Sequence, residues 1–323
     1  MPSALKLTIG ILVVLALSAT SLFIGVSDVS LGSLLSSAVE DRPMQVLLIS
    51  RVPRTLALIL AGSAIAVAGL IMQMLARNRF VEPSTAGTVE SASLGLLVVT
   101  IFAPGSPLLA KMMVAALFAL AGTALFMRLL AAIPLRSPLV VPLVGIMLGG
   151  VIASVTTFFA YRFDLLQTLG AWTMGDFSGI LRGRYELLWL AAGLTVIAWF
   201  AADRFTVAGL GEAFTTNLGL NYRRVLAIGL SIVAMVTAVV VVTAGAIPFL
   251  GLIVPNLVSA VMGDNMRRSI PWIALLGAGM VLASDIVGRL VRFPYEIPIG
   301  TVFGVAGSLI FLWLLLGRRR QLG

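Results

Sequence analysis

Residues 203–245 read DRFTVAGLGEAFTTNLGLNYRRVLAIGLSIVAMVTAVVVVTAG, a polar interval that continues directly into an apolar stretch. The apolar part, 224–245, has Arg224 as its one charged residue and has the length of about 20 residues that an α-helix needs to cross a bilayer. The polar part, 203–224, is the longest polar interval in the second half of the chain. The stretch therefore predicts a membrane-spanning helix that follows a solvent-exposed connection.

The polar interval itself has the pattern of a short amphipathic helix. Its apolar residues recur at helical spacing, namely Leu210, Phe214 and Leu218. Glu212 and Thr216 fall off this stripe, Gly219 suits the position after the last turn, and Asn221 suits the cap of the next helix. Two interpretations remain open: a solvated loop helix without a partner, or a docking surface whose apolar face enters a groove on another protein.

The composition is that of a polytopic membrane protein. Of the 323 residues, 60% are hydrophobic and 11% are charged, against about 25% charged residues in soluble domains. The net charge of +9 is explained by the Lys and Arg that gather in cytoplasmic loops, so no nucleic-acid partner is expected. The chain has no Cys and no His, which excludes disulfides, thiol and imidazole chemistry and the usual metal ligands, so no metal or cofactor is expected.

Ten apolar segments predict an all-α protein with a single transmembrane domain over residues 1–323. They are expected at about 5–26, 54–75, 86–103, 108–132, 138–160, 185–202, 224–245, 247–263, 271–291 and 297–316. An even number of spans places both termini on one side, and that side would hold thirteen of the 22 basic residues. The positive-inside rule then makes the termini and the segment 206–222 cytoplasmic. The first segment has the length of a span rather than of a signal-peptide core.

One carboxylate stands out inside an expected span. Asp285 lies four residues before Arg289, so the two share a helix face and are expected to pair. A proton relay is the alternative, but we expect no second intramembrane carboxylate to serve it. Arg51 and Arg54 flank Pro53 at the end of the first outer loop, 27–53. They either anchor the helix end at the lipid headgroups or receive a carboxylate from outside.

Small residues recur within the expected spans. Gly145 and Gly149 are four residues apart, as are Gly300 and Gly304, and this spacing allows close helix packing in lipid. Because Gly300 and Gly304 follow Pro298, a bend beside a pathway is a second interpretation.

A series of short motifs extends along nearly the whole chain. They are Arg51–Leu56, Ala68–Gln73, Arg77–Pro83, Gly245–Asn256, Gly263–Arg268, Ala283–Arg289 and Glu296–Gly300. In order and spacing they resemble the FecCD family, the permeases of bacterial type II ABC importers for iron–siderophores, haem and cobalamin. Asn78–Pro83 and Asn256 depart from the common family pattern and are most similar to the branch that imports ferric catecholate and related siderophores.

The resemblance implies a set of partners and a location. The permease would pair with a second permease, either the same or a related chain, in the bacterial inner membrane. Two cytoplasmic ATP-binding cassette subunits would bind below, and a periplasmic or lipoprotein siderophore-binding protein would bind above. ATP hydrolysis would belong to those cassette subunits, and this chain, which has no phosphate-binding loop, would not be an enzyme.

The resemblance also implies roles for individual residues. The residues that would dock the binding protein are Arg51, Arg54 and Arg289. The residues of the coupling helix that would contact the ATPase are Gly211, Glu212, Ala213, Phe214, Leu218 and Gly219. The residues that would line the pathway are Gly145, Gly149, Gly300 and Gly304.

The hypothesis from the sequence is a permease subunit that moves a ferric siderophore into the cytoplasm. Haem or cobalamin import by the same class is one alternative, and an ion-coupled secondary transporter is another. An intramembrane enzyme is disfavoured because the chain lacks His and Cys. Arg162, Arg182 and Arg184, near the expected outer mouth, either attract an anionic chelate or are ordinary loop charges.

Overall fold

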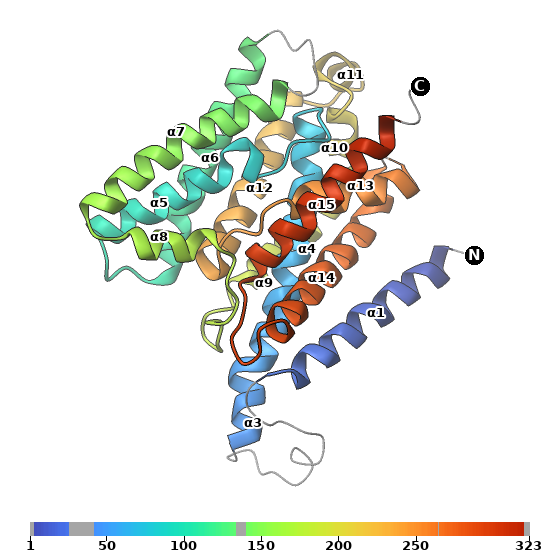
Figure 1. Ribbon diagram of the computed structural model, residues 1–323. Coiled ribbons are helices and arrows are strands. Elements are labelled where there is room, and N and C mark those ends of the chain that lie inside the picture. Colours follow the sequence, from blue (N-terminus) through green and yellow to red (C-terminus); the bar gives the residue numbers. More distant parts are fainter. Residues whose placement is uncertain (1–2, 26–41, 134–139, 264, 320–323) are drawn as a thin grey trace.

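The computed structural model describes residues 3–25, 42–133, 140–263 and 265–319, and every regular element in them is a helix (Figure 1). In chain order the elements are α1 (Ser3–Phe23), α3 (Arg42–Val46), the π-helical turn η1 (Leu47–Arg51), α4 (Val52–Leu75), the 3-10 turn η2 (Ser84–Ala86), α5 (Thr88–Phe102), α6 (Leu108–Ala132), α7 (Val140–Arg162), α8 (Leu166–Thr173), α9 (Leu188–Phe200), α10 (Ala202–Ala208), α11 (Glu212–Asn217), α12 (Tyr222–Ala244), α13 (Leu250–Met262), α14 (Met266–Leu290) and α15 (Ile299–Arg319). Most of the first outer loop and Arg136 lie outside the described residues.

A helix stands at each of the ten places where a span is expected, but the helices differ in length. Within the described ranges, six are long and apolar enough to cross a membrane, and α9 with α10, bent by 66°, would make a seventh. Three further apolar helices are shorter, namely α5, α13 and α15 as far as Trp313. The protein is therefore an all-helical, multi-pass membrane protein, and the count of ten spans stays a prediction.

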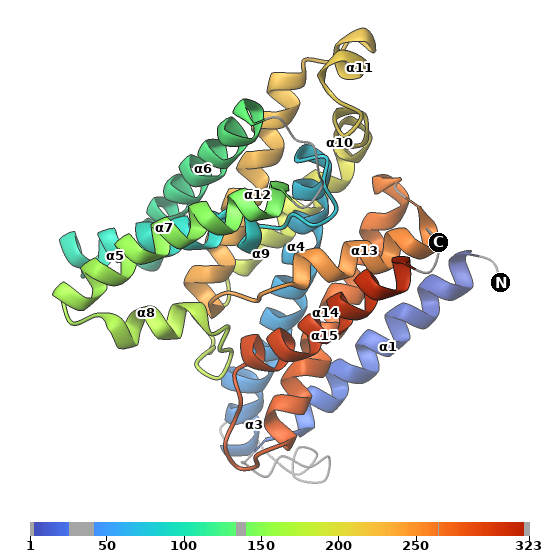
Figure 2. The ribbon, with the colours of Figure 1, turned by 45° about the horizontal axis from the view of Figure 1, so that its top comes forward.

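Helix α4 is the centre of the bundle. It passes between α5, α6 and α7 on one side and α1, α13, α14 and α15 on the other (Figure 2). A Cβ added at Gly69 would lie 2.0 Å from the carbonyl oxygen of Gly251 on α13, and one at Gly62 would lie 2.7 Å from that of Gly277 on α14. The helix backbones are thus in contact. In lipid, where the hydrophobic effect does not favour helix association, small residues stabilise helix pairs by allowing this close packing.

The start of α4 differs from the expectation of an open loop up to residue 53. The chain is helical from Arg42 onward, and η1 lies just before Pro53. Proline has no N–H to donate to the carbonyl four residues earlier, and its ring clashes with that carbonyl, so a wider turn is needed. The carbonyl concerned is that of Ile49, and it accepts the backbone N–H of Arg182 at 2.9 Å instead. The sequence predicts that the helix begins after Pro53, whereas the π turn extends it back toward Arg42.

Contacts along α14 fix the direction of its neighbours. A Cβ at Gly10 near the start of α1 would lie 3.6 Å from the Leu275 side chain, while Ser21 near the end of α1 binds Arg289. Helices α1 and α14 therefore run parallel. Arg54 at the start of α4 meets Asp285 near the end of α14, so α4 runs antiparallel to both.

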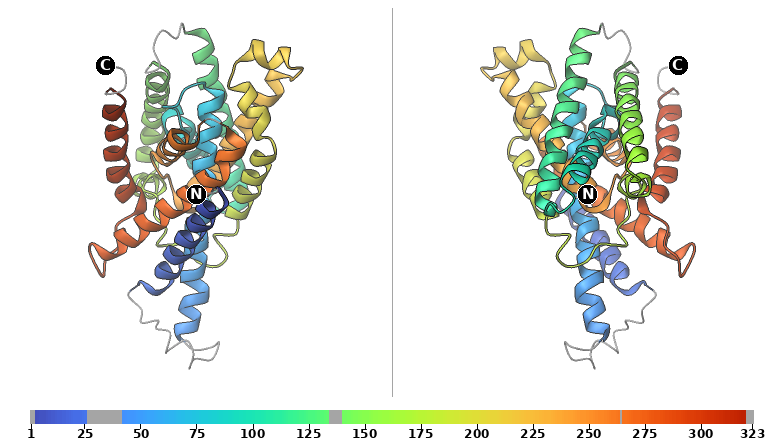
Figure 3. Two further views of the ribbon diagram at one scale, coloured as in Figure 1. Left: turned by 90° about the vertical axis from the view of Figure 1, so that its right-hand side faces the viewer. Right: turned by 90° about the vertical axis from the view of Figure 1, so that its left-hand side faces the viewer.

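The segment around α11 and the start of α4 lie at opposite ends of the molecule. Arg77, just after α4, has its guanidinium 3.0 Å from where a Cβ of Gly211 would stand, which places α11 beside the end of α4. Figure 3 shows α11 at one end and α3 at the other. The first helix begins, and the last helix ends, on the α11 side, since α15 follows Glu296, which binds Arg54. The assignment of that side to the cytoplasm stays a prediction.

Candidate functional site

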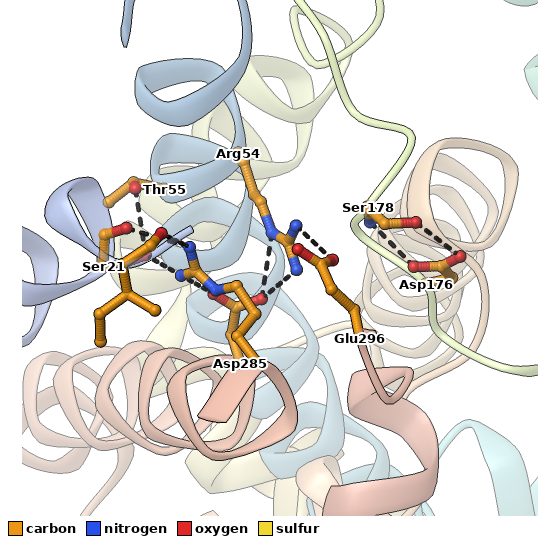
Figure 4. Close-up of polar contacts among 9 residues, drawn as sticks. Ser21, Arg54, Thr55, Asp176, Ser178, Asp285 and Glu296 are labelled. Atoms are coloured by element: carbon orange, nitrogen blue, oxygen red, sulfur yellow. Dashed lines mark hydrogen bonds and ion pairs between the residues drawn. The ribbon is translucent and has the colours of Figure 1, made fainter. Parts of the chain in front are cut away.

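A cluster of ion pairs joins α4 and α14 at the end opposite α11. The Asp285 carboxylate is fully buried, and its Oδ1 accepts from Nη2 of Arg54 at 2.6 Å and from Nε at 3.1 Å. Its Oδ2 accepts from Nη2 of Arg289, one helical turn away. Arg54 also donates from Nη1 to Glu296 Oε2 at 2.7 Å (Figure 4). Asp285 thus lies between the guanidiniums of Arg54 and Arg289, and Glu296 adds a second carboxylate partner for Arg54.

Arg289 and Arg51 bind the backbone carbonyls at the end of α1. Arg289 Nη1 donates to the carbonyl oxygens of Ser21 at 3.1 Å and Ile24 at 2.8 Å, and its Nη2 donates to Ser21 Oγ at 2.6 Å. Arg51 Nη1 donates to the carbonyl of Leu22 at 2.8 Å. The last carbonyls of a helix have no partner within the helix and carry partial negative charge, so cations are favoured there. The cluster therefore fixes three helices against one another.

The predicted ion pair between Asp285 and Arg289 is present, but sequence reasoning missed the participation of Arg54 and Glu296. The three arginines predicted to dock a binding protein are all largely buried. Arg51 is 6% exposed, Arg289 is 5% exposed, and the Arg54 side chain is 12% exposed. Each donates to a group of this same chain, and a docking role for them stays a prediction.

Other arginines at this end are open to solvent. Arg182 and Arg184 in the connection between α8 and α9 are exposed, as is Arg292 after α14. The backbone bond from Arg182 to Ile49 and the short chain distance from Arg289 to Arg292 place them around the buried cluster. A negatively charged partner approaching this end meets these three side chains before it meets the buried ones.

At the opposite end, α11 and the residues that flank it carry an apolar stripe that is exposed among the described residues. Leu210, Phe214 and Leu218 are 59%, 62% and 63% exposed. The other side of this short helix faces the protein, where the buried Thr215 hydroxyl donates to the carbonyl oxygens of Gly211 at 2.7 Å and Val207 at 3.2 Å. The helix is therefore held on its Thr215 side, and Phe214 and Leu218 are exposed on the opposite side, while Leu210 also borders a pocket beside the end of α4.

The ends of α11 are closed as the sequence predicts. Gly219 has a φ of 78°, a left-handed conformation that glycine tolerates best. The N–H of Leu220 donates to the Thr215 carbonyl at 3.1 Å, which completes a Schellman motif. Asn221 Oδ1 accepts from the Arg224 N–H at 3.0 Å and caps α12. Gly211, the residue just before the first turn of α11, has a φ of 105°.

The glycines predicted to line a pathway are mostly packing positions within the chain. A Cβ at Gly145 would lie 2.0 Å from the Thr85 carbonyl, and one at Gly300 would lie 2.1 Å from that of Met174 after α8. Gly149 is buried against the turn before α5. Gly304 has more room, with its nearest contact at 3.8 Å. Close packing explains the first three, and a pathway-lining role for the four stays a prediction.

Two carboxylates other than Asp285 are withdrawn from solvent among the apolar helices, contrary to expectation. Glu90 lies inside α5 and faces Gly149 of α7, and one of its oxygens is buried without a hydrogen bond in the described structure. Its place within the expected span 86–103 was the signal that could have revealed it. Glu82, in the connection before η2, is 1% exposed and accepts the Phe249 N–H at 2.8 Å.

Glu82 acts as a cap for α13 from a distant part of the chain. Its carboxylate faces the first N–H groups of α13, where an anion is favoured by the helix dipole. Burial raises the pKa of Glu82 to about 7, and the hydrogen bonds from Ser84 and from the backbone at Phe249 oppose that rise. Across the described ranges, no group of three or more potential metal-binding side chains comes together.

Comparison with known sequences decides the family. Residues 11–317 match the sequence pattern of the FecCD transport family. The chain belongs to the FecCD transport family. This FecCD protein is 48% identical over 316 residues to the petrobactin import system permease protein YclN of Bacillus subtilis (strain 168), a match that covers 98% of this chain and 99% of YclN.

Other import permeases show graded similarity to this chain. The ferric-anguibactin transport system permease protein FatD of Vibrio anguillarum is 40% identical, with 95% of this chain and 97% of that protein covered. The vitamin B12 import system permease protein BtuC of Shigella boydii is 33% identical, with 97% and 95% covered. Among solved structures, an inward-facing structure described as a metal-chelate type ABC transporter superposes with a TM-score of 0.80 at 23% identity, covering 97% of this chain and 99% of that one. At that identity the superposition shows the fold alone.

Proposed function

We propose that this FecCD protein is the permease subunit of an ATP-driven importer that carries a ferric siderophore across the bacterial inner membrane. The observation that carries the proposal is the 48% identity to a petrobactin import permease along almost the entire chain. The relatives named for petrobactin or anguibactin are 40–48% identical, whereas the vitamin B12 permeases are 33–34% identical. The substrate class therefore follows the siderophore relatives.

The energy source in this proposal is a separate pair of ATP-binding cassette subunits. The chain has no phosphate-binding loop of its own, so it needs a partner to use ATP. The segment 206–222 supplies a surface for that partner, because α11 presents Phe214 and Leu218 to solvent on a short, well-capped helix. Short amphipathic helices of this kind bind by placing apolar anchors in a groove. Movement of the ATPase would reach the bundle through Thr215 and the adjoining α10.

The binding protein would approach the opposite end. We infer that Arg182, Arg184 and Arg292 make the first contact, since they are exposed around the buried cluster. Arg54 would then exchange its Glu296 partner, which is 30% exposed, for a carboxylate of the binding protein. Arg51 and Arg289 would hold the α1 end in place during that exchange. Pairs between the exposed arginines and carboxylates of the binding protein would set the encounter rate and the register of docking more than the affinity.

A second permease, either a copy of this chain or a related one, would complete the pathway. The α7 helix carries a row of exposed apolar side chains four residues apart, Leu143, Met147, Val151 and Val155. On α15, Val305 and Leu309 are exposed in the same way. Rows of this kind suit the wall shared by two permeases, and Gly304 would widen it where the chelate passes.

The test of this proposal is reconstitution of the complex from its parts. The chain is expressed with a neighbouring ATPase and binding protein, purified in mild detergent, and assayed for ferric petrobactin bound to the assembly. We expect a complex of two permeases and two ATPases that retains the loaded binding protein. Retention of cobalamin or haem in place of the ferric siderophore would overturn the substrate assignment, and a chain that purifies with neither partner would overturn the class.

A charge-reversal pair tests the outer contact. Arg184→Glu together with Arg292→Glu should slow binding-protein association without changing thermal stability, because both side chains are exposed. The control is Arg128→Glu, an exposed arginine on α6. An unchanged association rate would show that the binding protein docks elsewhere.

A further inference from the structure

An apolar groove opens between α1, α13 and α14 on the α11 side of the molecule. It encloses a volume of about 460 Å³, within the range of roughly 300–1,000 Å³ of typical ligand pockets. Its walls are formed by Leu257 and Val261 of α13 and by Trp272 and Leu276 of α14, with Lys6 of α1 at the edge. Val261 is 82% exposed, so the groove is open along one flank of the bundle. In Figure 2, α1 lies beside α14 along this flank.

The groove has a basic rim at one end only. Lys6 lies one turn before Gly10, where an added Cβ would lie 3.8 Å from the Trp272 ring. Arg268 lies one turn before Trp272 on the same face of α14 and is exposed, as is Lys6. Since α1 and α14 run parallel, both cations lie toward the same end of the groove. The walls below them are aliphatic or aromatic.

Neither cation is neutralised by the rest of the described chain. The neighbouring Arg267 pairs with Asp203 at 2.5 Å and lies over the Trp199 ring, whereas no ion pair of Lys6 or Arg268 is found among residues 3–25, 42–133, 140–263 and 265–319. Two cations that have no ion pair among the described residues, above an apolar groove, are complementary to an anionic headgroup with an acyl chain beneath it. Basic pockets between helices on the cytoplasmic side bind anionic lipids in this way.

We propose that this groove is a binding site for one anionic glycerophospholipid of the inner leaflet. The phosphate would lie between Lys6 and Arg268, and one acyl chain would lie along Trp272 and Leu276 against Val261. The lipid would bridge α1 to α13 and α14 at the end where α1 lacks the arginine contacts that fix its other end. The inner-leaflet assignment rests on the orientation in the proposed function, while the site itself rests on the groove and its rim.

The test uses fluorescence quenching of Trp272 in the full-length permease. The protein is reconstituted in nanodiscs whose phosphatidylglycerol or phosphatidylcholine carries bromine on the acyl chains, since bromine in contact with an indole quenches it. The chain has five tryptophans, so the Trp272 signal is the difference between the wild-type protein and Trp272→Phe. We expect phosphatidylglycerol to reach half-quenching at a lower mole fraction than phosphatidylcholine does. The ratio should be about fivefold for each basic residue that contacts the headgroup.

Three variants identify the groove as the source of the preference. Lys6→Gln with Arg268→Gln should abolish the preference for phosphatidylglycerol, whereas Arg128→Gln on α6 should leave it intact. Val261→Phe, at an exposed wall position, should reduce quenching by both lipids because it fills the groove.

Each contrary outcome overturns the proposal. Equal quenching by the two lipids would make the groove an ordinary apolar surface. Quenching by neither lipid would mean that a protein segment or a second copy of the chain fills it. A preference that survives Lys6→Gln with Arg268→Gln would place the lipid elsewhere. No ATPase, binding protein or siderophore enters this measurement, so its failure is separate from a failure of the proposed function.

Discussion

Replacing Asp285 by asparagine removes the negative charge that lies between Arg54 and Arg289. Both guanidiniums would remain, with their side chains 12% and 6% exposed, and neither can turn to bulk water without leaving its other partners. Arg54 would keep Glu296 at 2.7 Å, whereas Arg289 would keep only the hydroxyl and carbonyl groups at the end of α1. Arg289 therefore bears most of the cost of the substitution.

The magnitude follows from the burial of the cluster. Removing one partner of a buried ion pair typically costs about 3–5 kcal/mol, because an uncompensated charge is left in a medium of low polarity. Removing the second partner as well, as in Asp285→Asn with Arg289→Met, relieves that penalty, since the Arg54 pair with Glu296 survives. The double variant should therefore be more stable than Asp285→Asn alone, although it loses the bonds to α1.

Thermal unfolding of the purified permease in detergent measures the effect. At roughly 2 °C for each kcal/mol in a chain of this size, Asp285→Asn should lower the midpoint by about 6 °C or more. The control is Asp176→Asn, because Asp176 is exposed at the same end of the molecule and, within the described ranges, its carboxylate accepts hydrogen bonds from Ser178 alone, at 2.8 and 2.9 Å (Figure 4). Equal midpoints for the two variants would refute the view that the cluster fixes the helices.

Two further substitutions test other parts of the account. Phe214→Asp should weaken ATPase binding by about thirtyfold, the effect of losing an interface anchor worth ~2 kcal/mol, and should leave the fold intact because the side chain is exposed. The control is Thr216→Asp, which lies off the apolar stripe. Equal binding of the two variants in a pull-down would contradict a docking role. Gly69→Ala should destabilise the bundle by about 1–3 kcal/mol, since its Cβ would lie 2.0 Å from a backbone oxygen. Gly105→Ala, whose Cβ would meet open space, is the control and should be neutral. Equal thermal unfolding midpoints for the two variants would contradict the packing of α4 on α13.

The sequence predicts best what depends on local chemistry. The capping of α11 follows from Gly219 and Asn221, because a left-handed residue and a side-chain cap are chosen by neighbours in the chain. The pair of Asp285 and Arg289 follows from a spacing of one turn. The positions of the long apolar helices follow from hydropathy alone.

Features that depend on distant contacts were beyond the sequence. Arg54 reaches Asp285 across 231 residues, so its inward orientation is invisible until α4 and α14 are packed together. Glu82 caps α13 from 167 residues away, and the residues next to Glu82 in the sequence do not indicate that contact. The glycines could be recognised as small residues. Whether Gly145 and Gly149 face a pathway or a neighbouring backbone depends on how α7 packs on η2 and α5, and for Gly300 it depends on how α15 packs on the residues after α8.

Transport by the purified complex in proteoliposomes tests the central claim most directly. The permease is reconstituted with its ATPase inside and its binding protein outside, and uptake of radiolabelled ferric petrobactin is followed with ATP, without ATP, and with an imposed proton or sodium gradient. We predict uptake that requires both ATP and the binding protein and that ion gradients alone do not drive. Uptake driven by a gradient without ATP, or ATP-driven uptake of cobalamin in place of the ferric siderophore, would contradict the account.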